Sequence, residues 1–98
     1  MNILKRNGSE VLFDKSKIVI AISKANDEVE PHERLPINRI AAIANDIEAD
    51  CAHLGYEVSV EDVQDMVEKQ ILDSNAFTLA KTYMRYRQDH NIARGKQE

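Results

Sequence analysis

The chain has 98 residues, of which 43% are hydrophobic and 31% are charged, and its formal net charge is −4. This length supports one modest hydrophobic core and is too short for two domains. No apolar run reaches the roughly 18 residues of a membrane span, so none is predicted. The N-terminal stretch MNILKRNG lacks the apolar core of a signal peptide, and we therefore expect a cytoplasmic protein.

The charge is distributed unevenly along the chain. Residues 1–25 carry five cations against two acids, residues 26–80 carry three against thirteen, and residues 81–97 carry five against one. Binding to duplex nucleic acid requires many phosphates to be neutralised by cations. The acidic segment 26–80 would instead repel the phosphates. A nucleic-acid binder is thus disfavoured, but the two basic ends could meet in space and form one small anion site.

Side chains suited to catalysis or metal binding are few and scattered. Cys51 is the only cysteine, which excludes an intramolecular disulfide and a cysteine-rich zinc site, and we interpret it as a small core residue. His32, His53 and His90 lack a metal-binding spacing, and no glycine-rich phosphate loop or nucleophile–histidine pairing is present. We therefore predict no catalytic residues and no metal site within the chain.

The N-terminal residues predict a β-hairpin. Residues 2–6 and 10–13 are short β-prone runs that flank Asn7-Gly8. This dipeptide is typical of a type I′ turn, in which both central residues need a positive φ. A hairpin this short is marginal alone, so we expect it to lie on another element.

Two amphipathic helices are expected next. Asp14 is the predicted N-cap of the first, which extends to about residue 26 with an apolar stripe of Ile18, Ala21, Ile22 and Ala25. Acidic residues and two prolines in 26–36 predict a loop, and Pro36 suits the first turn of the second helix. The stripe of that helix, which we expect to end at Gly55, consists of Ile37, Ile40, Ala44, Ile47, Cys51 and Leu54.

The last third of the chain predicts one strand and two further helices. Residues 56–59 are long enough for a third strand beside the hairpin, and Ser59 can cap a helix with Asp62 in its first turn. The inward positions of that helix are Val63, Val67 and Ile71. Residues 73–75 interrupt the pattern, and a final helix over about 76–93 carries apolar Phe77, Ala80, Tyr83, Met84 and Tyr86. The order ββα-α-βαα predicts an α+β domain, a four-helix bundle capped by a small three-stranded sheet.

The hairpin and the helix behind it concentrate positive charge. Lys5, Arg6, Lys15 and Lys17 fall within fourteen residues. Lys17 lies in the first helical turn, where free N–H groups and the helix dipole already favour an anion. A cation there is unfavourable unless something negative neutralises both, so this cluster suggests a phosphate site. The alternative to a phosphate site is that these are ordinary solvated lysines without a ligand.

The motifs KRNG, FDKSKIVIAISKA, VSVEDVQDMVE and YMRYR, taken in this order and spacing, resemble the ATP-cone domain. The resemblance covers about residues 3–94, so residues 1–98 are interpreted as one such domain. ATP-cones are nucleotide-binding regulatory modules at the N-terminus of many ribonucleotide reductases. One also occurs in a bacterial repressor, which carries a zinc ribbon of four cysteines that this chain lacks.

The resemblance implies that ATP or dATP, together with Mg2+, binds between the β cap and the bundle. By position, Lys5, Arg6 and Lys17 would hold the phosphates. Ile3 would lie against adenine, and Gln64 would lie near the base or ribose. Asn7 replaces the commoner Asp before the turn glycine, which the turn tolerates.

In this family ATP leaves the reductase active, and dATP inhibits it through a change in oligomeric association. The expected partners are therefore adenine nucleotides, a catalytic reductase domain and other cones, without membrane or nucleic acid. FDKSKI and SVEDVQDMVE look most like the anaerobic, class III reductases, of which the chain would be an excised N-terminal domain; a free-standing cone is the alternative. A different class of function also stays open, a helical protein-interaction module without nucleotide control.

Overall fold

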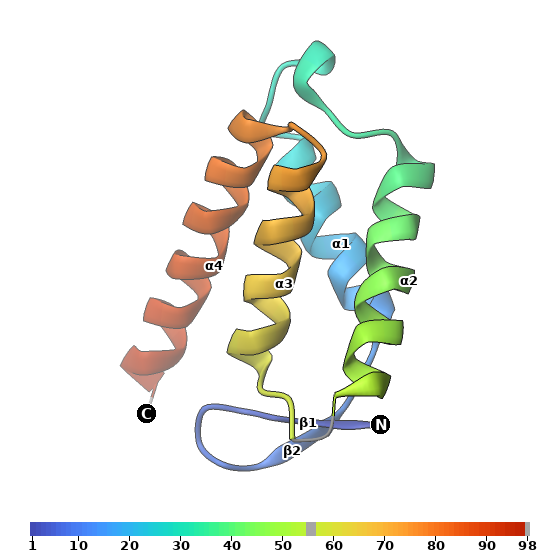
Figure 1. The fold of residues 1–98 in the computed structure, drawn as a ribbon. Coiled ribbons are helices and arrows are strands. Elements are labelled where there is room, and N and C mark those ends of the chain that lie inside the picture. The colour runs from blue at the N-terminus through green and yellow to red at the C-terminus, as the bar shows by residue number, and fades with distance from the viewer. Residues whose placement is uncertain (55–56, 98) are drawn as a thin grey trace.

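Four helices lie side by side, and a β-hairpin crosses one end of them (Figure 1). The computed structural model describes residues 1–54 and 57–97, with side chains up to Asp89. The elements are β1 (Asn2–Leu4), β2 (Glu10–Leu12), α1 (Lys15–Asn26), a 3-10 turn (Pro31–Glu33), α2 (Ile37–His53), α3 (Val60–Asp73) and α4 (Phe77–Gln97). Helices α1 and α3 each pack against both α2 and α4, which confirms the predicted bundle.

The hairpin is confirmed, but the predicted turn type is wrong. Strands β1 and β2 pair antiparallel, with Ile3 opposite Val11. The Gly8 N–H donates to the Lys5 carbonyl at 3.0 Å, so Arg6 and Asn7 are the central turn residues. Gly8 follows with φ 85°, whereas Asn7 has no positive φ. A longer hairpin loop of this kind needs only one left-handed residue, and glycine supplies it at least cost.

The predicted third strand is reduced to a single bridge among the described residues. The Leu4 N–H donates to the Val58 carbonyl at 2.9 Å, and Leu4 pairs with Ser59 in parallel. The sheet therefore has two strands, and the first residue of the predicted strand, Tyr56, lies outside the described residues, as does Gly55, the predicted end of the second helix. Pairing stops after Ser59 because this residue already caps α3, so that the chain turns into the helix.

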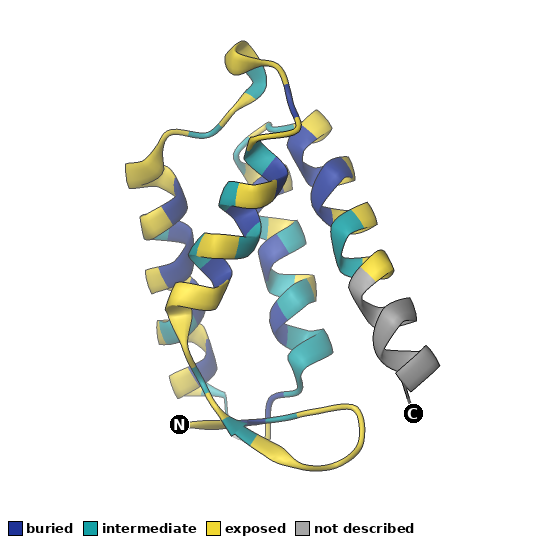
Figure 2. Ribbon diagram, turned by 180° about the vertical axis from the view of Figure 1, so that it is seen from behind, coloured by how far each residue is buried: buried dark blue, intermediate teal, exposed yellow. Residues whose placement is uncertain are grey.

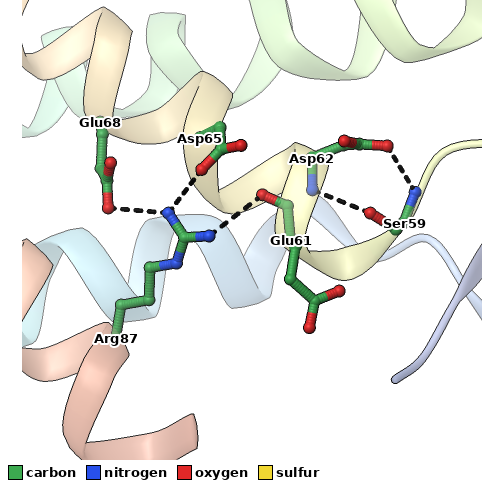
Figure 3. A network of polar contacts seen from close by, with 6 residues as sticks. All are labelled: Ser59, Glu61, Asp62, Asp65, Glu68 and Arg87. Carbon is green, nitrogen blue, oxygen red and sulfur yellow. Dashed lines mark hydrogen bonds and ion pairs between the residues drawn. The ribbon is translucent and has the colours of Figure 1, made fainter. Parts of the chain in front are cut away.

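The predicted caps of α1 and α3 are both present. The Asp14 carboxylate accepts hydrogen bonds from the Ser16 N–H at 3.0 Å and from the Ser16 hydroxyl at 2.6 Å. Ser59 and Asp62 form a reciprocal capping box, in which each side chain accepts from the other backbone N–H (Figure 3). Pro36, expected inside the first turn of α2, is instead its N-cap.

The core lies between the four helices and continues beneath the hairpin (Figure 2). Its buried side chains are Ile3, Ile18, Ile22, Ala25, Val29, Ile40, Ile43, Ala44, Ile47, Cys51, Val58, Val63, Val67, Ile71, Leu79, Ala80 and Tyr83. Most predicted inward positions are among them. Burial raises the pKa of the Cys51 thiol, in agreement with its interpretation as an unreactive core residue.

Four predicted apolar positions do not join the core: Tyr86 is only half-buried, and the other three are exposed. Ile37, Phe77 and Met84 are 67%, 58% and 37% exposed. Ile37 and Phe77 are the first residues of their helices, where the facing helix no longer covers them. Ile43 and Leu79 are fully buried instead. In the part of the chain that the structure describes, no helix is long and apolar enough to cross a membrane.

Candidate functional site

A pocket of about 720 Å³ lies where the hairpin meets α1, α3 and α4. It brings together all five residues singled out in the sequence, which come from three separate segments. Its lining consists of Ile3, Lys5, Arg6, Asn7, Val11, Leu12, Phe13, Asp14, Lys17, Ile18, Ile20, Ala21, Val60, Val63, Gln64, Val67, Tyr83, Tyr86 and Arg87. The juxtaposition follows from the fold, since the hairpin lies across the ends of the helices that supply the other walls.

One side of the pocket is cationic. Lys5 and Arg6 begin the hairpin loop, and Lys17 is the third residue of α1, near the positive end of its dipole. All three are exposed, so their charges face solvent at the pocket. Lys15, by contrast, is held toward α2 by Asn45 at 3.0 Å and Glu48 at 3.6 Å. Of the four clustered cations, three therefore line the pocket and one does not.

An acidic group also belongs to this side. The hydrogen bonds from the Ser16 hydroxyl and N–H lower the pKa of Asp14, with a smaller contribution from the charge of Lys17. Asp14 is thus a carboxylate at neutral pH, committed to capping α1 rather than to pairing with a ligand.

Much of the remaining lining is apolar. Ile3, Val63, Val67 and Tyr83 are buried and contribute to the lining, and burial raises the pKa of the Tyr83 hydroxyl. A pocket lined by both cations and apolar side chains fits a ligand that has an anionic part and an apolar part.

Gln64 places an unsatisfied polar atom among these apolar residues. Its Oε1 is buried and has no hydrogen-bond partner, the one such side-chain atom found in the described residues. Leaving a buried acceptor unpaired costs about 1–3 kcal/mol. A ligand with a suitably placed N–H or O–H would remove this cost. Gln64 thus offers a hydrogen-bond acceptor to a ligand among the apolar lining residues.

Arg87 is a pocket residue that the sequence analysis did not identify as one. It pairs with acids of α3: its Nη1 donates to Asp65 at 2.7 Å and to Glu68 at 2.8 Å (Figure 3). Burial alone would lower the Arg87 pKa, but these hydrogen bonds outweigh it and raise the pKa. One face of α4 carries Tyr83, Tyr86 and Arg87, which are spaced by three and four residues from the first of them. This spacing is the sequence signal that could have predicted that all three line the same site.

Arg6 also has an acidic neighbour on α3. Its Nε lies 3.9 Å from the Glu61 carboxylate, and both side chains are substantially exposed. Acids of α3 thus contact pocket cations from both the hairpin and α4, although Glu61, Asp65 and Glu68 do not themselves line the pocket. No cluster of three or more potential metal-ligating side chains occurs in the described residues.

These features define a small α+β domain with a pocket whose lining suits an anionic, partly apolar ligand. Residues 1–92 match the model of the ATP cone domain, and the chain belongs to this family. ATP-cone domains are nucleotide-binding allosteric regulatory domains of ribonucleotide reductases. The coarse function expected from the motifs is thereby confirmed.

The chain is similar to parts of several reductases. It is 30% identical over 95 residues to the anaerobic ribonucleoside-triphosphate reductase of Haemophilus influenzae, covering 96% of this chain and 13% of that protein. It is 33% identical over 103 residues to the ribonucleoside-diphosphate reductase subunit alpha of Chlamydia muridarum, covering 96% of this chain and 10% of that protein. A vitamin B12-dependent reductase of Thermoplasma acidophilum is 33% identical over 106 residues, covering 98% and 13%.

The chain thus spans only about a tenth of the length of these relatives. It corresponds to their regulatory cone and not to their catalytic part, and the domain itself is not catalytic.

Proposed function

We propose that the pocket binds ATP or dATP as an allosteric ligand, with the triphosphate at Lys5, Arg6 and Lys17. The observation that carries this proposal is that the three cations line one pocket together with an apolar wall. Each contact would be a charge-assisted hydrogen bond, stronger than its neutral equivalent. Mg2+ would accompany the nucleotide through phosphate oxygens and water, as this ion commonly does.

The base would occupy the apolar side. Ile3 is buried next to the hairpin loop and offers an aliphatic surface for a flat ring. Gln64 would accept a hydrogen bond from the exocyclic amine of adenine, which would satisfy its otherwise unpaired Oε1. Triphosphate and base would then contact opposite walls of the same pocket.

In the whole protein, this domain would control a reductase, most simply an anaerobic ribonucleoside-triphosphate reductase in the cytoplasm. ATP would leave the enzyme active, and dATP would inhibit it by changing association between cones or with the catalytic domain. The two ligands differ by one 2′-hydroxyl, worth about 1–3 kcal/mol if a buried partner is gained or lost. Such a difference shifts a balanced association equilibrium by tenfold or more.

Nucleotide binding is tested by calorimetric titration and thermal melting of the domain. We expect both ATP and dATP to raise the melting temperature, because a ligand that binds only the folded state stabilises it by mass action. The domain should not hydrolyse either nucleotide. Absence of both binding heat and thermal shift at millimolar nucleotide would contradict the proposal.

Association is tested separately, because an interaction module without nucleotide control is the competing function. Exposed apolar side chains favour some contact surface: Ile37 and Phe77 begin α2 and α4, at the end of the bundle remote from the hairpin (Figure 1). We expect the sedimentation coefficient to differ between ATP and dATP. If the sedimenting species has the same mass with ATP, with dATP and without nucleotide, the result would favour the interaction module.

A further inference from the structure

Helix α3 carries three acids along the side that faces the pocket arginines. Glu61, Asp65 and Glu68 are spaced by four and three residues, which places them on one helical face. They contact Arg6 and Arg87, one from the hairpin and one from α4. We call these three residues the α3 acid row. Figure 3 shows their arrangement around Arg87.

The contacts with Arg87 are the stronger ones. The Arg87 side chain is 17% exposed, and its Nη1 lies 2.7 Å from Asp65 and 2.8 Å from Glu68. Its Nη2 additionally donates to the Glu61 carbonyl oxygen at 3.4 Å. One cation thus contacts two carboxylates, and this group of three side chains, of which only Arg87 lines the pocket, has an excess negative charge. The Arg6–Glu61 pair is longer and more exposed, so it contributes less.

A polyanionic ligand that approaches the pocket arginines therefore finds them already paired with carboxylates of the protein. Phosphate oxygens and carboxylates bind the same guanidinium donors, and Arg presents them in a fixed fork. The excess charge of the row also repels the ligand over several ångströms. Both effects weaken phosphate binding without any change in the lysines.

We propose that the α3 acid row is an internal competitor for the two pocket arginines, so that it sets the nucleotide concentration at which the pocket fills. On binding, the phosphates replace the carboxylates as the counter-ions of Arg6 and Arg87. The inference rests on the proposed function, since it concerns the same pocket and an anionic ligand. Its sign is specific: removing the acids strengthens binding.

The test is titration of the Asp65→Asn/Glu68→Gln double variant with ATP and, separately, with inorganic tripolyphosphate. These amides keep an oxygen that can accept from Arg87 but lose the charge. We expect affinity for both probes to rise about threefold to tenfold, and Glu61→Gln alone to give a smaller rise. The matched control is Asp73→Asn, which removes one charge from the far end of α3 and should leave affinity within about twofold.

Apo melting gives an independent readout. The double variant should melt at a lower temperature, because Arg87 loses two charged partners that link α3 to α4. Lower stability with higher affinity is the signature of competition, whereas a purely structural role would lower both.

The outcomes separate the two proposals. If the wild type binds ATP and the double variant binds it equally or more weakly, the competition is refuted and nucleotide binding stands. If the wild type binds tripolyphosphate but not ATP, the nucleotide function fails, and the response to tripolyphosphate decides the competition. If it binds neither, both fall.

Discussion

Replacing Lys17 by Ala should weaken ATP and dATP binding by about 1.5–3 kcal/mol, or roughly tenfold to more than a hundredfold. Lys17 lines the cationic wall from the first turn of α1. The substitution removes a charge-assisted hydrogen bond to a phosphate. Both nucleotides should lose the same amount, because their phosphates are identical.

The same substitution should leave the empty domain as stable, or more stable by a few tenths of a kcal/mol. Lys17 faces the positive end of its own helix dipole and shares the pocket with Lys5 and Arg6. Removing one of these like charges relieves repulsion that the ligand otherwise neutralises. Lys17 is thus placed where it is useful only with an anion present.

The measurement is apo melting plus titration with each nucleotide. Lys15→Ala is the matched control, since Lys15 lies two residues away but is held by Asn45 and Glu48 on α2. It should change affinity far less than Lys17→Ala. An unchanged affinity of the Lys17 variant, or a loss confined to one nucleotide, would mean that Lys17 is not a phosphate ligand.

Features set by neighbouring residues could be predicted from the sequence. The caps at Asp14 and Ser59 depend on contacts within about one helical turn, and the inward positions of α3 follow from the spacing of its apolar residues. The hairpin was predicted correctly, but its turn type was wrong and its central pair lies one residue earlier, because Asn-Gly suits more than one hairpin loop. Ile37 failed for a different reason: helical spacing does not reveal where the neighbouring helix stops.

The composition of the pocket was only partly predictable. The hairpin cations and Lys17 stand out because they are clustered in a mostly acidic chain. Arg87 does not, since its place in the pocket depends on how α4 packs against α3 and α1. In the sequence, its acidic partners on α3 likewise have the pattern of an ordinary solvent-exposed helix face. These acids differ from other surface acids only in that tertiary packing brings Arg87 next to them, and a local sequence pattern does not reveal that contact.

The unpaired oxygen of Gln64 leads to the second large effect. Gln64→Leu has a similar size and removes a buried acceptor that lacks a partner. We therefore expect the empty domain to become more stable, by about 1 kcal/mol, in thermal or denaturant unfolding. As with Lys17, the native residue is unfavourable until the ligand binds.

ATP binding should change in the opposite direction. If Gln64 accepts from the exocyclic amine of adenine, Gln64→Leu loses about 1–3 kcal/mol of affinity for ATP. The amine is then left without a partner in the apolar part of the pocket. Phosphate contacts are untouched, so affinity for tripolyphosphate should stay the same.

A double-mutant cycle with purine riboside triphosphate, which lacks that amine, isolates the contact. The wild type should bind this analogue about fivefold to a hundredfold more weakly than ATP. The Leu variant should bind the two nearly equally, because the partner of the amine is already gone. The coupling free energy, obtained from four titrations, measures the pair rather than either group alone. A coupling near zero would show that Gln64 does not read the amine, and the base would then be recognised by the apolar wall without a directional contact from this residue.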